Sequence, residues 1–177
     1  TTKQAEYLEL IRRSGVHLLY LINTLLDLSK VEAGEIELNL ATVNLAEICQ
    51  EALQEIEVKA QEKRQEISLA LPIARETIVV DRQRVIQMLL SYLSNAIKFT
   101  PEGGGIVLST RLASPLEMRE QNLTAAAMDS AAYFLVISVS DTGIGVAVEK
   151  QHLLFQLFQQ VEGATNRRYE GAGLGLA

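Results

Sequence analysis

The chain has 177 residues, of which 48% are hydrophobic, and a mean hydropathy of +0.13. These values are typical of a globular protein and exclude a disordered chain, and no apolar run reaches the length of a membrane span. The net charge of −6 argues against nucleic acid or membrane lipid as a partner, because general electrostatic attraction would be missing. A single cysteine, Cys49, excludes an internal disulfide framework and favours a reducing, cytoplasmic setting.

Residues 1–34 are predicted to form one long helix. Apolar and small residues recur in it with alternating steps of three and four, which is the pattern of a helix that pairs along a seam. Because one helix cannot bury such a seam, we expect residues 5–33 to pack on a partner helix, a second subunit or both; packing back on its own domain is the alternative. The seam consists of Leu8, Ile11, Gly15, Leu18, Ile22, Leu25 and Ser29, widened by Leu19, Leu26 and Leu28.

Between residues 35 and 99 the spacing of apolar residues changes several times between two and about 3.6, which predicts strands and helices in a mixed order. Polar capping residues and a proline mark the boundaries. The predicted elements are a short edge strand over 35–40, a helix capped by Asn44, strands over 65–71 and 77–81 joined by a turn at Pro72, and a helix over 82–99.

The remainder of the chain opens with a glycine-rich turn and continues the mixed pattern. Such a mixture predicts an α+β fold, a two-layer α/β sandwich in which one sheet carries helices on one face. The elements expected here are strands over 106–112 and 133–140, a polar surface insertion with a helical turn over 113–132, a helix over 148–158, and a mobile loop over 159–170.

Asn95 and Lys98 are three residues apart on a predicted helix and therefore share a face. An asparagine amide offers Mg²⁺ the hard oxygen ligand that this ion prefers, and a lysine can meet phosphate as a point charge. Taken alone, the pair has a simpler interpretation, in which Asn95 caps a turn and Lys98 is solvated. The chemical interpretation depends on the other two segments.

Asp141 ends a predicted strand and is followed by Thr142, Gly143, Ile144 and Gly145. A carboxylate at a strand end can accept a hydrogen bond from the exocyclic amine of adenine, and the two glycines allow a flat base to approach the backbone. A simple strand-ending turn is one alternative. An aspartic protease is another, but it needs two such carboxylates and the sequence has one copy, so a homodimer would be required.

The third segment is Gly171-Ala172-Gly173-Leu174-Gly175, which looks like a loop entering a helix. Free backbone N–H groups in such a loop favour phosphate oxygens. The spacing matches neither the dinucleotide fingerprint nor the Walker P-loop. Arg167 and Arg168 precede the loop and are placed to reach a terminal phosphate, with exposed loop charges as the alternative. The three segments together predict an ATP site.

In this order the segments resemble the catalytic region of the sensor histidine kinases of two-component systems, whose ATP-binding fold is shared with gyrase, Hsp90 and MutL-type ATPases. Residues 95–100 resemble the N box of that family and residues 141–145 the first glycine box. Residues 154–158 resemble the F box and residues 171–177 the second glycine box. Residues 7–34 are similar to the second helix of the dimerisation and phosphotransfer domain.

The resemblance implies two parts, a partial dimerisation helix over 1–34 and a C-terminally truncated ATP-binding domain over 35–177, of the Bergerat type. It also implies a role for each matching residue. Asn95, Lys98 and Arg167 are expected to be catalytic, with Asn95 as the Mg²⁺ ligand and Ser91 as a further metal ligand. Contacts to ATP are expected from Asn95, Lys98, Phe99, Asp141, Gly143, Ile144, Gly145, Arg167, Gly171, Gly173, Leu174 and Gly175.

The activity implied is transfer of the γ-phosphoryl group of ATP to a histidine outside this chain, for relay to an aspartate of a response-regulator receiver domain. The implied assembly is a homodimer through helix 5–33 and a first helix that the chain lacks. The implied location is the cytoplasm, including the cytoplasmic part of a membrane-bound sensor. His17 and His152 are interpreted as surface histidines, not as the phosphate acceptor.

The sequence departs from the family pattern at Ser91, where a second asparagine is usual. A hydroxyl binds metal more weakly than an amide, so reduced turnover is expected. Two alternatives to the kinase therefore stay open. One is a related ATPase that is not a kinase, although Ser91 and Asn95 offer no acidic group to activate water. The other is a degenerate module that binds ATP without turnover.

Overall fold

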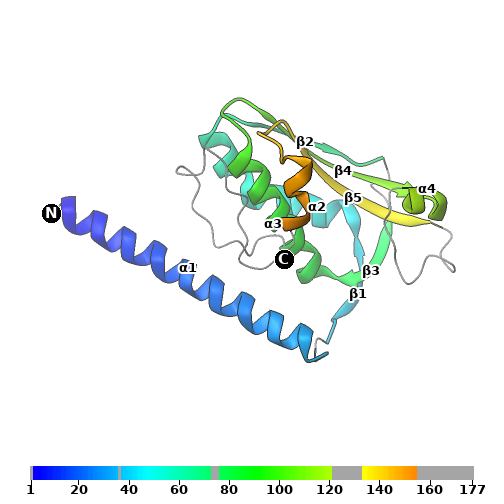
Figure 1. The fold of residues 1–177 in the computed structure, drawn as a ribbon, viewed down its shortest axis with the longest axis horizontal. Coiled ribbons are helices and arrows are strands. Elements are labelled where there is room, and N and C mark those ends of the chain that lie inside the picture. The colour runs from blue at the N-terminus through cyan, green and yellow to red at the C-terminus, as the bar shows by residue number, and fades with distance from the viewer. Residues whose placement is uncertain (1, 36, 73–75, 121–132, 155–177) are drawn as a thin grey trace. The chain divides into compact units, whose positions relative to one another are not determined.

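The structure, a computed structural model, describes residues 2–35, 37–72, 76–120 and 133–154. The chain forms two compact units, one over Asn39–Val146 and one made of the flanking residues. Figure 1 labels the helices and strands of both units. Each unit is described by itself below.

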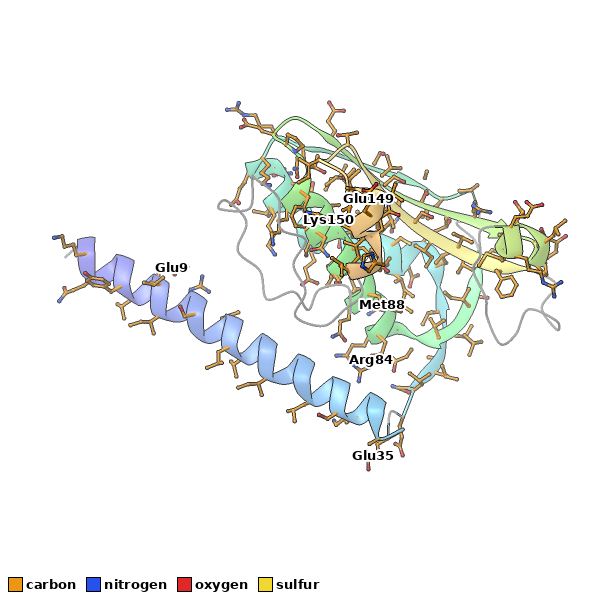
Figure 2. All side chains as sticks on the ribbon, in the orientation of Figure 1. Glu9, Glu35, Arg84, Met88, Glu149 and Lys150 are labelled. Atoms are coloured by element: carbon orange, nitrogen blue, oxygen red, sulfur yellow. The ribbon has the colours of Figure 1, made fainter. Side chains whose placement is uncertain are left out.

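The helix predicted at the start of the chain is confirmed as α1, Thr2–Glu32. It ends at Gly34, whose positive φ of 69° is a conformation that glycine adopts at little cost. The described residues of the predicted seam are exposed, with Leu8 at 68% and Ile11 at 67%. Figure 2 shows the side chains of this helix, with Glu9 labelled on it and Glu35 just after its end. Pairing of the seam with a second helix stays a prediction.

Among the described helices, none combines the length and the apolar content needed to cross a bilayer.

Helix α2, Leu45–Glu62, begins where the sequence predicts it. The side chain of Asn44 accepts hydrogen bonds from the backbone N–H groups of Ala46, at 2.8 Å, and Glu47, at 3.3 Å. These bonds satisfy two of the N–H groups that a helix leaves unpaired at its first turn. The apolar residues of the helix lie on one buried face: Leu45, Ile48, Cys49, Ala52, Ile56 and Ala60.

Helix α3, Arg82–Phe99, is also confirmed. Asp81 caps it by accepting the Arg84 N–H at 3.1 Å, and this bond lowers the pKa of the Asp81 carboxyl. The buried face of α3 packs against that of α2, and Figure 2 shows Arg84 and Met88 one turn apart on α3. The buried residues of α3 are Ile86, Leu89, Leu93, Ala96 and Ile97.

Among the described residues the strands form two sheets, which corrects the single sheet expected from the sequence. In one sheet, β1 (Leu40–Asn44) pairs antiparallel with β3 (Thr77–Asp81). The other sheet has the order β2-β4-β5, with β2 (Glu66–Ala70) parallel to β4 (Gly105–Ala113) and β4 antiparallel to β5 (Phe134–Asp141). The strands flanking Pro72 therefore do not pair with each other. Strand pairing is nonlocal, and the order of strands along a chain does not determine it.

The edge strand predicted over residues 35–40 is wrong. The described residues before Leu40 lack strand structure, and β1 begins only at Leu40. Pairing with β3 sets the register of β1, because Leu40 lies opposite Asp81 and Asn44 opposite Thr77. The backbone N–H of Asn39 donates to the Asp81 side chain at 3.0 Å, so the chain before β1 is held by the α3 cap.

Two short elements complete the described chain. Helix α4, Pro115–Glu120, is the helical turn expected in the insertion, of which residues 121–132 lie outside the described residues. Where the sequence predicts a helix over 148–158, the structure has a 3₁₀ helix, η1, over Val148–Leu153, and residues 155–158 lie outside the described residues. A 3₁₀ helix is wound more tightly than an α-helix and rarely extends beyond a few residues. The loop predicted over 159–170 lies outside the described residues.

The core of the Asn39–Val146 unit lies between the helices and one face of the β2-β4-β5 sheet. Ile106 and Leu108 from β4 are fully buried there, in one cluster with apolar residues of α2 and α3. Figure 1 shows these two helices on one side of the sheet. Alternate residues of a strand face the same side, so the partly buried Leu135, Ile137 and Val139 of β5 join this core. The predicted two layers, sheet and helices, are confirmed for this unit.

Candidate functional site

Asp141 is the last residue of β5 and lies opposite Ile106 of β4. It follows the alternation that turns Ile137 and Val139 toward the helices, so its carboxylate lies on the helix side of the sheet. The residue is exposed. Oδ1 accepts the N–H of Gly143 at 2.8 Å. A carboxylate has a second oxygen, and Oδ2 can accept a hydrogen bond from a ligand amine.

The loop after Asp141 is held by backbone contacts to the neighbouring strand. The N–H of Thr142 donates to the Gly105 carbonyl at 3.0 Å, and the Gly105 N–H donates to Oγ1 of Thr142 at 2.9 Å. Gly145 has a positive φ of 66°, which explains a glycine at this position. The loop therefore has a fixed course relative to β4.

The same loop also contacts the end of α3. The N–H of Ile144 donates to the Phe99 carbonyl at 3.3 Å. A Cβ at Gly143 would lie 2.8 Å from that carbonyl oxygen and 2.5 Å from Oδ1 of Asp141. Because these distances are shorter than any real Cβ contact, only glycine allows the loop to approach both groups.

Helix α3 carries Ser91, Asn95 and Lys98 at spacings of four and three, so they lie on one side of the helix. All three are partly buried. Burial lowers the pKa of the Lys98 ammonium. Its Nζ lies 4.9 Å from the centroid of the Phe99 ring. A partly desolvated cation attracts an anion more strongly than a solvated one does, and phosphate is such an anion.

The structure thus brings the first two predicted segments together through Phe99, whose backbone carbonyl contacts the loop and whose ring contacts Lys98. The third segment is not tested, because Arg167, Arg168, Gly171, Gly173, Leu174 and Gly175 lie outside the described residues. His152 is exposed in η1, as interpreted. His17 lies within α1, and its side chain is outside the described part.

Two supporting residues escaped the sequence analysis. Lys63 and Gln65 follow α2, and both donate to backbone carbonyls at the end of α3. Gln65 is only 7% exposed. In the sequence they stand in the polar run Glu62-Lys63-Arg64-Gln65-Glu66, at the start of the strand predicted over 65–71, and this run gives no signal that either side chain contacts α3.

The residues that could hold a divalent metal are few. Within the described ranges no group of three or more His, Cys, Asp or Glu side chains is placed to bind one. The Asn95 amide is a single neutral oxygen ligand, which suits Mg²⁺ because this ion usually keeps several waters and binds phosphate oxygens as well. In the described part of the chain, the Asn95 amide is thus a group that fits such a metal.

Comparisons with known proteins agree with this chemistry. A family model described as histidine kinase-, DNA gyrase B-, and HSP90-like ATPase matches residues 80–177. The circadian input-output histidine kinase CikA of Thermosynechococcus vestitus is 40% identical over 100% of this chain, which covers 22% of that protein. The match to an ATPase family excludes the aspartic protease alternative for Asp141.

Solved structures of histidine kinases are also similar to this chain. Full-length ShkA in complex with AMPPNP is 33% identical, with a TM-score of 0.75, over 99% of this chain and 32% of that one. The histidine kinase ThkA in complex with the response regulator protein TrrA matches 84% of this chain and 39% of that one, with a TM-score of 0.57. At 19% identity this second likeness concerns the fold alone. The chain spans between 22% and 39% of the length of these relatives.

Proposed function

The chain belongs to the histidine kinase-, DNA gyrase B- and HSP90-like ATPase family, and we propose that it is the catalytic region of a sensor histidine kinase. In this proposal it binds Mg-ATP and transfers the γ-phosphoryl group to a histidine outside this chain. The observation that carries the proposal is the contact between the Asp141 loop and Phe99 at the end of α3, the helix that also carries Asn95 and Lys98. The bound analogue AMPPNP in ShkA supports a nucleotide at the equivalent fold.

The described residues divide the work of binding. Asp141 accepts the exocyclic amine of adenine and excludes guanine, which carries a carbonyl at that position. Gly143, Ile144 and Gly145 form the backbone and the apolar surface against the base. Phe99 shapes the pocket, and Lys98 lies against the phosphates. Arg167 and the glycines at 171, 173 and 175, with Leu174, are proposed to complete the phosphate contacts.

Catalysis is proposed to rest on positioning and charge neutralisation, as in other phosphoryl transfers. Asn95, with Ser91 beside it, would hold Mg²⁺, which when bound neutralises charge on the phosphate oxygens. Lys98 adds a positive charge on the same side of α3. Because Lys98 is already partly desolvated in the apo chain, this charge needs little reorganisation at the moment of transfer.

The proposed context is a two-component system. Residues 1–34 would be the second helix of a dimerisation domain and residues 35–177 the ATP-binding domain. The exposed seam of α1 supports pairing with a further helix in a homodimer. The phosphate would pass from histidine to an aspartate of a response-regulator receiver domain, the class of protein that TrrA represents for ThkA. The region is proposed to act in the cytoplasm.

Replacing Asp141 tests the adenine site. We expect Asp141→Asn to weaken ATP binding by about 1–3 kcal/mol, because the amide turns one acceptor into a donor that faces the adenine amine. Isothermal titration calorimetry with ATP and GTP measures both the loss and the change in base preference. Glu102→Gln removes an exposed carboxylate at the neighbouring turn and serves as the matched control. Unchanged ATP affinity in Asp141→Asn would refute the assignment.

Replacing Lys98 separates phosphate binding from stability. Burial lowers the Lys98 pKa in the folded chain, so the unfolded chain binds more protons. The destabilisation caused by the buried charge therefore disappears as the pH rises toward the ordinary lysine pKa of 10.5. We expect Lys98→Met to keep or increase the free energy of unfolding at neutral pH and to weaken ATP binding about tenfold. Urea denaturation and calorimetry measure the two quantities. Lys59→Met, at an exposed position of α2, is the control; parallel losses in both measurements would contradict the prediction.

The alternatives to a kinase give different products. Labelled ATP is mixed with the chain and a purified dimerisation domain that bears a phosphoacceptor histidine. Acid-labile, base-stable label on the partner identifies a kinase. Free phosphate without labelled partner identifies a related ATPase, and nucleotide binding with neither product identifies a degenerate module, which the Ser91 departure makes worth testing.

A further inference from the structure

The backbone carbonyls of residues 97–100, here called the α3 carbonyl cluster, end the helix that carries Asn95 and Lys98. The last carbonyls of an α-helix have no partner within the helix and need donors from elsewhere. The preceding carbonyl, of Ala96, accepts the N–H of Thr100 at 2.9 Å and closes the last turn. The cluster beyond it is satisfied from two other parts of the fold.

Lys63, the C-cap residue of α2, supplies the first donor. Its Nζ donates to the Ile97 carbonyl at 2.7 Å and to the Lys98 carbonyl at 3.1 Å. A cation at this end also opposes the negative end of the helix dipole. The Lys63 carbonyl in turn accepts the N–H of Gly103 at 3.2 Å, so the residue contacts both the helix end and the turn that follows it.

Gln65 supplies the second donor from a buried position. Its Nε2 lies 2.7 Å from the Thr100 carbonyl, 3.1 Å from the Ile97 carbonyl and 3.4 Å from the Pro101 carbonyl. The amide has two N–H groups to share among these three acceptors, and its buried Oε1 has no hydrogen-bond partner among the described residues. The remaining member of the cluster, the Phe99 carbonyl, accepts the N–H of Ile144 in the Asp141 loop.

We propose that Lys63 and Gln65 are positioning residues for the nucleotide site, because they fix the α3 carbonyl cluster on which the Asp141 loop rests. Neither side chain is assigned a contact with nucleotide. Their effect passes through the Phe99 carbonyl, whose place sets the distance between the adenine loop and the Asn95–Lys98 side of α3. A role of Lys63 and Gln65 in nucleotide binding rests on the proposed function. The contact between the Ile144 N–H and the Phe99 carbonyl is present without nucleotide.

The test removes the Lys63 donor in the full chain and follows the Ile144 amide. Lys63→Met keeps the aliphatic stem and loses the ammonium, and we expect at least threefold faster hydrogen exchange at Ile144, with amides in the middle of the β4–β5 ladder nearly unchanged. Calorimetry is expected to show about tenfold weaker ADP binding, with a smaller change for inorganic triphosphate, which has no adenine. Lys63→Arg, which retains a cationic donor, is expected to restore both values.

Lys59→Met is the matched control, since it removes one exposed positive charge about one turn earlier on α2. Equal effects from this control, or an unchanged Ile144 amide and ADP affinity in folded Lys63→Met, would overturn the inference. If Lys63→Met does not fold, Lys63→Gln, with a shorter donor, is expected to give the same changes at smaller size. A wild-type chain that binds no adenine nucleotide would count against the proposed function, and Ile144 exchange alone would then decide the positioning role.

Discussion

Gly143→Ala is expected to reduce adenine-nucleotide affinity at least 100-fold, the largest loss of binding from any single methyl group in this site. The new Cβ would lie 2.5 Å from Oδ1 of Asp141 and 2.8 Å from the Phe99 carbonyl oxygen. The backbone carbonyl at the end of α3 cannot yield cheaply, and any shift of the Asp141 side chain would move the carboxylate that is proposed to read adenine. The methyl group would therefore displace the carboxylate and the loop together, and calorimetry with ADP measures the result.

A suitable control is Gly103→Ala in the turn after α3. Gly103 has a positive φ of 77° and open space around its Cβ position, so alanine there adds backbone strain without a clash. We expect the free energy of unfolding to fall by about 1 kcal/mol and ADP affinity to stay close to that of the wild type. Affinity within threefold of the wild type in Gly143→Ala would show that the loop can move without loss and would contradict the geometry.

Local pattern sufficed to predict most elements of the Asn39–Val146 unit. Helices α2 and α3 combine a polar cap, Asn44 or Asp81, with apolar residues at helical spacing, and both signals are local in the sequence. The end of α2 was harder to predict from the sequence. The chain leaves this helix through Arg64, whose φ of 52° is in the region usually occupied by glycine, so the usual stop signal is missing.

The pairing between strands could not be predicted from the local sequence pattern. β2 lies parallel to β4 across the whole of β3 and α3, and β3 pairs back to β1. Such contacts depend on how α2 and α3 cover the sheet, which no short window contains. The shifted start of β1 has the same origin: the alternation of residues 35–40 was a valid strand pattern, but the partner strand is in register only from Leu40 onward.

In the candidate site, too, some residues could be predicted from the sequence and others could not. Asn95, Lys98, Asp141 and Gly143 were predicted from the combination of their segments and from the family resemblance. Their roles stay predictions, and the structure shows that the two segments meet at Phe99. The groups that hold them there were not recognisable. Gln65 is a common polar residue in a polar run, and its three carbonyl acceptors lie more than thirty residues further along the chain.

Asn95→Ala should produce the largest loss of turnover. Its amide is proposed as the Mg²⁺ ligand, and in the described part of the proposed site α3 offers besides it the weaker Ser91 hydroxyl. We expect phosphoryl transfer to a histidine-bearing dimerisation domain to fall about 100-fold, the usual scale for removal of one preorganised electrostatic group. ATP affinity measured in EDTA should change little, because Asp141 and Lys98 are retained.

The separation of these two effects is what identifies a metal role. In wild type, adding Mg²⁺ should strengthen ATP binding, and in Asn95→Ala this gain should largely disappear. Ser94→Ala, an exposed neighbour on the same helix, controls for helix propensity and should retain the gain. If Asn95→Ala lost affinity equally with and without Mg²⁺, Asn95 would be a nucleotide contact or a packing residue and not the metal ligand. Asn95 would then be a positioning residue like Lys63 and Gln65, because it lies on the helix whose end bears the Phe99 carbonyl.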